Sequence, residues 1–109
     1  MTERRPAVFF DRDGVLNEDF PGYTHRPEAL VWMPGARAAV ARVNALGWWA
    51  FVVTNQSGVA HGLYGLADVE AFHAAMAAQL AEMGARMDAF RACPYHPEGK
   101  VPAFRRDAP

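Results

Sequence analysis

The sequence predicts an α/β protein in which helices flank a parallel β-sheet, giving three layers. Two continuous apolar runs, residues 7–10 and 49–53, are typical of strands buried on both faces. The segment between them carries apolar residues at helical spacing. Because a strand, helix, strand order joins parallel neighbours through a right-handed crossover, these observations together indicate a parallel sheet.

The first half of the chain contains a strand, a helix and a second strand. The first predicted strand is Ala7–Phe10, which ends at Asp11. Pro34-Gly35 opens the predicted helix, and Gly47 is placed to end it. The apolar stripe of this helix is Ala36, Ala39, Val40, Val43 and Leu46. The second predicted strand, residues 49–53, is followed by polar residues.

The second half predicts one more helix, one more strand and a loop. The helix runs from about Asp68 to Met83, and Gly84 stops it. Its apolar face consists of Val69, Phe72, Met76, Leu80 and Met83. Residues 87–93 form a third strand, and the proline-rich stretch 94–109 reads as a loop. In such a Rossmann-like sheet, ligands gather at the carboxyl ends of the strands, so residues 11–13 and 54–57 should meet at one rim.

Composition limits the partners and the compartment. Eleven basic and twelve acidic residues give a net charge of −1, which offers no broad surface for nucleic acid or anionic membrane. The single cysteine cannot form an internal disulfide, and the first residues do not resemble a signal peptide. The longest apolar stretch is far shorter than the roughly 20 residues that span a bilayer. We expect one cytoplasmic domain in 109 residues.

The stretch "FFDRDGVLN", residues 9–17, places two acids next to a glycine after a strand. An EF-hand loop fails, because Gly14 falls at position 4 and Gly22 at position 12, where that loop needs glutamate. A solvated acidic turn is one remaining interpretation. The other is phosphoryl transfer, in which Asp11 attacks phosphorus, Asp13 handles the leaving-group proton, and a divalent cation offsets their charge.

These motifs resemble a known family. "FFDRDGVLN" is similar to the first motif of the haloacid dehalogenase superfamily of phosphatases. "VVTNQSGVAHG" resembles the second motif of the branch that contains D-glycero-D-manno-heptose-1,7-bisphosphate phosphatase and the histidinol-phosphatases. "GYTHRPEALVWMPGA" and "CPYHPEGK" extend the resemblance over nearly all of the chain.

The resemblance implies a role for each matching position. Asp11 would form the phosphoaspartyl intermediate, and Asp13 would act as general acid and base. Mg²⁺ would be held by the Asp11 carboxylate and the Asp13 backbone carbonyl, oxygen ligands of the kind this cation prefers. Thr54 would hydrogen-bond the phosphoryl group. The expected phosphate- and substrate-binding set is completed by Asn55, Gln56, Ser57 and His61, the last in place of a common arginine.

Several nearby residues have more than one interpretation. Arg12 should point away from both acids on strand geometry, which leaves two interpretations open, an ion pair outside the site and a substrate contact. His73 lies beside the apolar stripe of its helix, and we interpret it as structural. His25 and Arg26 lie in a loop where substrate contact is open. His96 and Lys100 face either the substrate phosphate or solvent.

The chain departs from the family in two ways. Relatives with structural zinc carry Cys-x-His and two further cysteines, whereas Tyr95 stands in the histidine place here, so we predict no zinc and a small buried Cys93. The family also continues into a lysine and an acidic pair that are missing here. Residues 1–109 are therefore predicted to be a single haloacid dehalogenase-like domain truncated before them, incomplete on its C-terminal side. The unpaired edge of residues 7–10 could support self-association.

The resulting functional hypothesis is a Mg-dependent phosphatase that acts on a small phosphorylated sugar, with D-glycero-D-manno-heptose 1,7-bisphosphate favoured. Histidinol phosphate is the alternative substrate. A catalytically incomplete fragment, or a phosphate-binding module that is not an enzyme, is the alternative of a different class.

Overall fold

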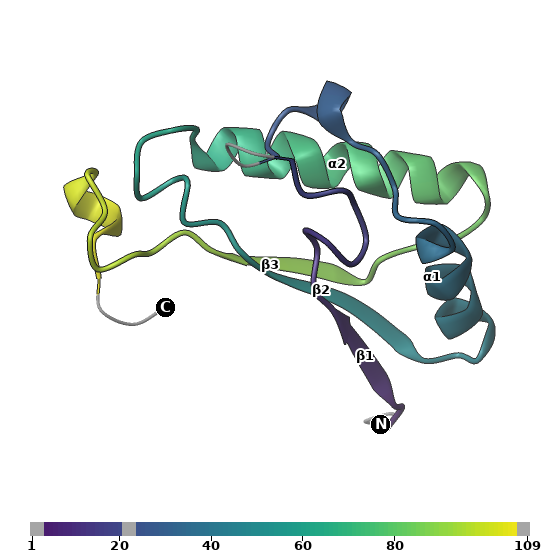
Figure 1. The fold of residues 1–109 in the computed structure, drawn as a ribbon. Coiled ribbons are helices and arrows are strands. Elements are labelled where there is room, and N and C mark those ends of the chain that lie inside the picture. Colours follow the sequence, from purple (N-terminus) through teal and green to yellow (C-terminus); the bar gives the residue numbers. More distant parts are fainter. Residues whose placement is uncertain (1–3, 21–23, 107–109) are drawn as a thin grey trace.

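The computed structural model describes residues 4–20 and 24–106. Its strands are β1 (Ala7–Phe10), β2 (Trp49–Asn55) and β3 (Ala89–Cys93), and its helices are α1 (Ala36–Ala45) and α2 (Leu66–Glu82). Short 3₁₀ helices occupy Pro27–Ala29 and Pro102–Phe104. Figure 1 shows the strands side by side below α2, with α1 at one end of the molecule. Each predicted strand and helix is present, with ends shifted by at most two residues.

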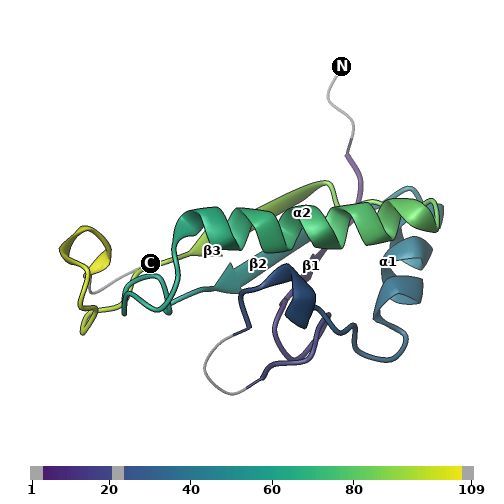
Figure 2. The same ribbon diagram turned by 90° about the horizontal axis from the view of Figure 1, so that it is seen from above.

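The three strands form one parallel sheet in the order β1-β2-β3. Phe10 pairs with Val52, and Val52 pairs with Phe90. When successive parallel strands are added at the same edge of a sheet, right-handed crossovers place the connecting helices on the same face of that sheet. Both helices accordingly lie on one face, with α2 running roughly alongside β3 (Figure 2). The α/β class and the parallel sheet are confirmed, and within the described ranges one helix layer covers the sheet.

The core lies between the sheet and the two helices. Val52 of β2 packs there with Val40 of α1 and with Phe72, Met76 and Leu80 of α2. The predicted stripe of α2 is confirmed except for its last member, since Met83 is exposed. In α1 the buried residues are Ala36, Val40 and Val43. Ala39 and Leu46, predicted in that stripe, are exposed.

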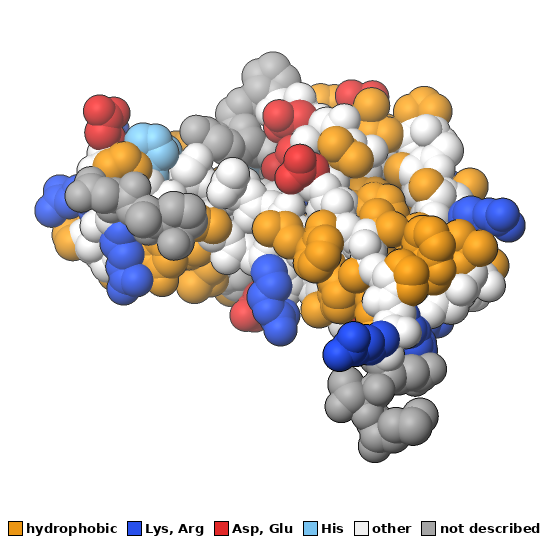
Figure 3. Space-filling model, turned by 90° about the horizontal axis from the view of Figure 1, so that it is seen from below, with side chains coloured by type: hydrophobic (Ala, Val, Ile, Leu, Met, Phe, Trp, Pro, Cys, Tyr) orange, Lys and Arg blue, Asp and Glu red, His pale blue; other side chains and the backbone are white. Residues whose placement is uncertain are grey.

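The opposite face of the sheet is open. Phe9 of β1 is 65% exposed and Val53 of β2 is 48% exposed, so the prediction that these two strands are buried on both faces is wrong. The physical reason is that no described helix lies beneath the sheet. Hydrophobic side chains gather on this underside in Figure 3. β1 also keeps one edge unpaired within the described residues, as expected.

The segment after β3 packs against the loop that follows β2. The Val101 amide donates to the Ala60 carbonyl at 2.9 Å. A side chain at Gly99 would place its Cβ 2.9 Å from the same carbonyl oxygen, so the two segments meet at a position that needs glycine. Phe104 packs on a small cluster formed by Val59, Tyr64 and Val69. Among the described helices, none is long and apolar enough to cross a bilayer.

The open face predicts self-association of the 109-residue chain. We expect its average mass in sedimentation experiments to rise above 12.0 kDa at about 100 µM, because an exposed apolar patch is stabilised by burial against another surface. Phe9→Thr combined with Val53→Thr should return the mass to that of the monomer.

The matched control replaces two apolar residues of similar exposure away from the sheet face. Val31 and Leu63 are 47% and 53% exposed. Val31→Thr combined with Leu63→Thr should leave the association unchanged. A chain that stays monomeric before any substitution would contradict the prediction.

Candidate active site

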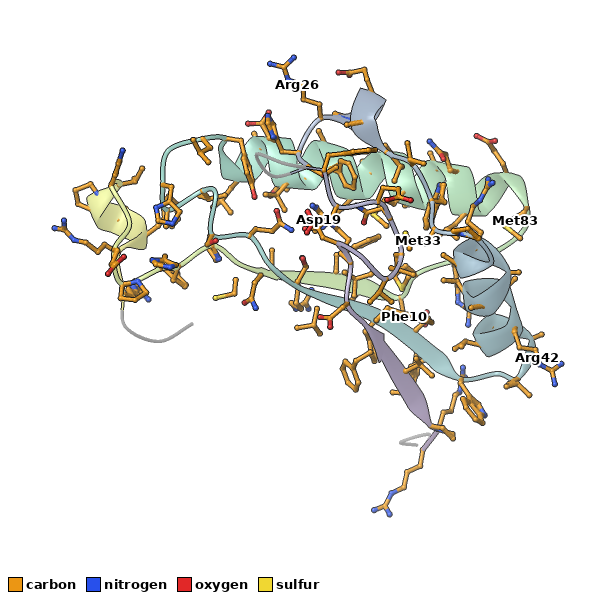
Figure 4. All side chains as sticks on the ribbon, viewed as in Figure 1. Phe10, Asp19, Arg26, Met33, Arg42 and Met83 are labelled. Carbon is orange, nitrogen blue, oxygen red and sulfur yellow. The ribbon has the colours of Figure 1, made fainter. Side chains whose placement is uncertain are left out.

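The candidate site lies where β1 and β2 end. Asp11 follows the last residue of β1, Phe10, which Figure 4 labels, and Thr54 and Asn55 are the last residues of β2. The Gln56 Nε2 atom donates to Asp13 Oδ2 at 3.0 Å, across 43 positions of the chain. The prediction that residues 11–13 and 54–57 meet at one rim is therefore confirmed.

A tight turn carries the two acids. The Arg12 carbonyl accepts from the amides of Val15, Leu16 and Asn17 at 3.2, 2.8 and 3.2 Å. Gly14 has a φ of 83°, which glycine adopts without strain. Leu16 is 1% exposed and belongs to the core, so it anchors the turn to the body of the protein. The turn directs the side chains of Arg12 and Asp13 in a way that an extended strand would not.

Asp11 is exposed, and its carboxylate makes no hydrogen bond or ion pair with any residue in 4–20 or 24–106. An ionised carboxylate has about four lone-pair positions, and no described residue uses any of them at Asp11. A carboxylate that attacks phosphorus needs an oxygen free of competing donors. The surroundings of Asp11 satisfy that condition.

Arg12 is buried, at 1% exposure, and is paired with Asp13. Its Nε and Nη2 atoms lie 2.9 and 2.7 Å from Asp13 Oδ1, and Nη2 also donates to the Thr24 carbonyl at 2.8 Å. The guanidinium carbon lies 4.3 Å from the centre of the Phe72 ring. The prediction that Arg12 points away from both acids is wrong, because the turn brings it back onto Asp13. A buried charge needs such partners to offset its lost hydration.

The two carboxylate oxygens of Asp13 differ in the number of hydrogen-bond donors that contact them. Oδ1 accepts from Arg12 and, at 3.0 Å, from Asn17 Nδ2. Oδ2 accepts from Gln56 alone among the described residues. Because a carboxylate oxygen has about two lone-pair positions, Oδ2 retains room for one more hydrogen bond or proton. Oδ1 thus fixes the carboxylate in place, and Oδ2 is the oxygen that can take a further hydrogen bond or a proton.

The residues fit a hard cation at the two predicted positions. Among the described residues, none hydrogen-bonds the Asp11 carboxylate and none donates to the Asp13 carbonyl oxygen. Both are oxygen ligands, and Mg²⁺ commonly binds one or two carboxylates while keeping water and phosphate ligands. Within residues 4–20 and 24–106, three or more His, Cys, Asp or Glu side chains do not gather at one point. We therefore find two candidate ligands for magnesium in the described part of the chain.

Gln56 and Thr54 are buried behind the rim, at 1% and 5% exposure. Gln56 Nε2 donates to Thr54 Oγ1 at 2.8 Å, and Gln56 Oε1 accepts from the Tyr64 hydroxyl at 2.6 Å. Sequence reasoning missed Tyr64. A signal for it was the glycine at position 58, where a Cβ would lie 2.2 Å from the Tyr64 ring.

The other predicted binding residues follow Thr54 along the chain, and no hydrogen bond or ion pair joins His61 to Asp11 or Asp13 among the described residues. Asn55 is exposed, and Ser57 and His61 are half-buried. The His61 ring lies 4.6 Å from the ring of His96, whose Nδ1 accepts from the Glu98 amide at 3.0 Å. The His25 ring stacks on Tyr64 at 4.6 Å.

Three further positions singled out in the sequence differ in their exposure. Lys100 and Arg26 are exposed. Cys93 is half-buried at the end of β3, so the prediction of a buried side chain is wrong; β3 is an edge strand of the described sheet, with no further strand beside it.

His73 is a structural residue, as predicted. It is 8% exposed, its ring stacks on Phe90 at 4.5 Å, and its Nε2 atom lies 3.4 Å from Arg12 Nη1. The pKa of His73 is lowered from 6.5 to about 4, chiefly because the ring is buried and then because Arg12 is charged, while Asp13 acts in the opposite direction. A neutral ring under the guanidinium avoids a repulsion inside the core.

Comparisons with known proteins support the resemblance seen in the motifs. The chain is 49% identical over 102 residues to the D-glycero-beta-D-manno-heptose-1,7-bisphosphate 7-phosphatase of Rhodopseudomonas palustris, an alignment covering 94% of this chain and 56% of the relative. It is 47% identical to the corresponding Thermosynechococcus vestitus protein, covering 91% and 52%. The chain spans about half the length of the curated relatives it matches. No protein-family model matches the chain.

Solved structures agree with the fold. The D,D-heptose 1,7-bisphosphate phosphatase of Bordetella bronchiseptica, solved with magnesium and phosphate, has a TM-score of 0.81 at 35% identity, over 94% of this chain and 60% of that one. A putative haloacid dehalogenase-like phosphatase of Mesorhizobium loti has a TM-score of 0.89 at 37% identity, over 99% and 51%. The predicted family resemblance and fold class are confirmed.

The lowered pKa of His73 predicts a loss of stability in mild acid. Between pH 6.5 and about 4 the unfolded chain binds a proton at this ring that the folded chain does not, so stability falls as pH decreases through that window. From pH 7 to pH 5 we expect the unfolding free energy to drop by roughly 2 kcal/mol through this residue. Urea unfolding at the two pH values measures it.

The control is a second histidine. His73→Leu should remove most of the difference between pH 7 and pH 5, whereas His61→Gln should preserve it, because no comparable burial surrounds the half-buried His61 ring. Equal pH dependence in the wild type and His73→Leu would contradict the assignment.

Proposed function

The chain is homologous to haloacid dehalogenase-like heptose bisphosphate phosphatases, and we propose that it carries the nucleophile and the proton carrier of such an enzyme. The observation that carries the proposal is the contrast between two neighbouring acids. Asp11 is exposed and has no hydrogen-bond partner among the described residues, while Asp13 is held by Arg12, Asn17 and Gln56. A nucleophile needs freedom from competing donors, and a proton carrier needs a fixed position.

In the proposed reaction, an Asp11 carboxylate oxygen forms a bond to phosphorus while the bond from phosphorus to the leaving oxygen breaks. Asp13, a carboxylate in the substrate-free site, takes up a proton from solvent on the second lone pair of Oδ2 as the substrate binds, and passes that proton to the leaving oxygen. Asp13 then takes a proton from water, whose oxygen attacks the phosphoaspartyl group, releasing phosphate and restoring Asp11. Bound Mg²⁺ would supply positive charge that offsets the acids and the phosphoryl oxygens. Thr54, Asn55, Ser57 and His61 form the proposed phosphate- and substrate-binding rim, with Gln56 behind it.

The proposed substrate is D-glycero-D-manno-heptose 1,7-bisphosphate. Its support is the activity for which the relatives and the Bordetella bronchiseptica structure are named, since these proteins share more than a third of their aligned residues with this chain. Histidinol phosphate serves as the competing substrate in the test. Residues 1–109 are proposed as the first part of one domain whose lysine and acidic pair lie outside this chain, in keeping with the span of about half the relatives' length.

Replacing the nucleophile tests the reaction class. In the complete gene product, Asp11→Asn should lower phosphate release from the heptose bisphosphate by roughly three orders of magnitude or more, because no other described carboxylate has its exposed position at the end of β1. Removal of Mg²⁺ with a chelator should also abolish release. Phosphate assay of wild type and variant, with each substrate, measures both.

The matched control is Glu70→Gln, an exposed carboxylate on α2 that makes no hydrogen bond with a described residue. It should retain wild-type turnover. Equal release by wild type and Asp11→Asn would rule out the proposed nucleophile. Faster release from histidinol phosphate would transfer the substrate assignment to that compound.

The 109-residue chain alone is expected to turn over slowly. Only two candidate magnesium ligands are present among its described residues, and each missing charge-stabilising group costs about two to three powers of ten in rate. The assay compares this chain with the complete gene product at equal concentration. Phosphate binding without turnover would favour the binding-module alternative for the isolated chain, and equal turnover would contradict the expectation.

A further inference from the structure

We propose that Tyr64 and Gln56 are positioning residues that make the Thr54 hydroxyl a hydrogen-bond donor to the phosphoryl group and hold Asp13 in place. The inference rests on the proposed phosphatase function and adds to it a set of buried residues that orient the Thr54 hydroxyl from behind the rim. Its evidence is a chain of buried hydrogen bonds that links Tyr64, Gln56 and Thr54.

The orientation of the Gln56 amide follows from its partners. The atom at one end lies 3.0 Å from Asp13 Oδ2 and 2.8 Å from Thr54 Oγ1. An ionised carboxylate only accepts hydrogen bonds, so the atom facing Asp13 must be the nitrogen. The amide nitrogen has two hydrogens, and the two acceptors use both. Gln56 is therefore a donor to Asp13 and to Thr54 at once.

The other end of the amide determines the direction of the Tyr64 hydroxyl. Gln56 Oε1 lies 2.6 Å from the Tyr64 oxygen and can only accept, so the Tyr64 hydroxyl donates. Gln56 is 1% exposed and Tyr64 is 8% exposed, which leaves little access for water to replace either partner. The bonds thus run in one direction, from Tyr64 through Gln56 to Thr54.

Thr54 receives the end of this chain. Its Oγ1 accepts from Gln56, so its own proton is left for another acceptor. The described acceptor within reach is the Asn55 carbonyl at 3.5 Å, the outer limit of a hydrogen bond. A phosphoryl oxygen at the rim would be a better acceptor, and a fixed donor is worth most where negative charge develops in the transition state.

The position of Tyr64 is itself constrained. A Cβ at Gly58 would lie 2.2 Å from Tyr64 Cε1, so the ring lies directly against the glycine backbone. The His25 ring stacks on the Tyr64 ring, with the two ring centres 4.6 Å apart and an angle of 5° between the ring planes. Val59 and Val69 complete the cluster in which the ring packs. Tyr64 therefore has little freedom to turn away from Gln56.

The test is Tyr64→Phe in the complete gene product, assayed for phosphate release from the heptose bisphosphate. The variant keeps the ring and removes only the hydroxyl. We expect kcat to fall about tenfold while KM stays within about twofold, because the lost orientation matters most in the transition state. Gln56→Met, which removes both donors, should lower kcat by about a hundredfold.

The matched control is Tyr95→Phe. Tyr95 is half-buried and its hydroxyl makes no hydrogen bond with a described residue, so its removal should change neither constant. Thermal unfolding checks that each variant is folded. In nitrogen-15 spectra, the Gln56 side-chain amide protons should exchange slowly in the wild type and faster in Tyr64→Phe.

Two failures are distinguishable. A wild type that releases no phosphate would overturn the proposed function, and the positioning role with it. An active wild type whose kcat is unchanged in folded Tyr64→Phe would overturn the positioning role alone. A rise in KM without a fall in kcat would also overturn it, since that pattern indicates ground-state binding.

Discussion

The burial of the Arg12 charge is the constraint around which the site is organised. A guanidinium at 1% exposure has lost its hydration and is stable only with partners. Asp13 and the Thr24 carbonyl supply them, and the Phe72 ring of α2 covers the remaining face. This one side chain therefore joins the turn after β1, the loop that contains Thr24, and the long helix. After the burial of the His73 ring itself, which is the larger cause, the Arg12 charge also lowers the pKa of that neighbouring ring.

The same constraint gives two adjacent acids opposite surroundings. Arg12 draws the Asp13 carboxylate inward, where Asn17 and Gln56 take further positions on it. Asp11 remains at the open end of β1 with no described partner. Carboxylates of the same type can thus serve different chemical roles, because the donors around each one decide whether it is held or available. The pair of roles proposed for the enzyme follows from that difference.

The sheet explains both the position of the site and the open surface. Parallel strands bring their carboxyl ends to one rim, so residues separated by more than forty positions meet there. Growth of the sheet in one direction puts α1 and α2 on one face and leaves the other uncovered within the described residues. The exposed Phe9 and Val53 are consequences of topology rather than of unusual residues.

The sequence by itself determined the strands, the helices and the meeting of residues 11–13 with residues 54–57. These features depend on the spacing of apolar residues and on the polar residues that follow each strand, all of which lie close together in the chain. It also indicated Asp11, Asp13 and Thr54. Only the tertiary structure decided that Arg12 turns back and is buried, that Phe9 is exposed, and that Tyr64 supports Gln56. Those facts depend on partners from distant segments, such as Thr24 and Phe72 for Arg12, and no local pattern encodes them.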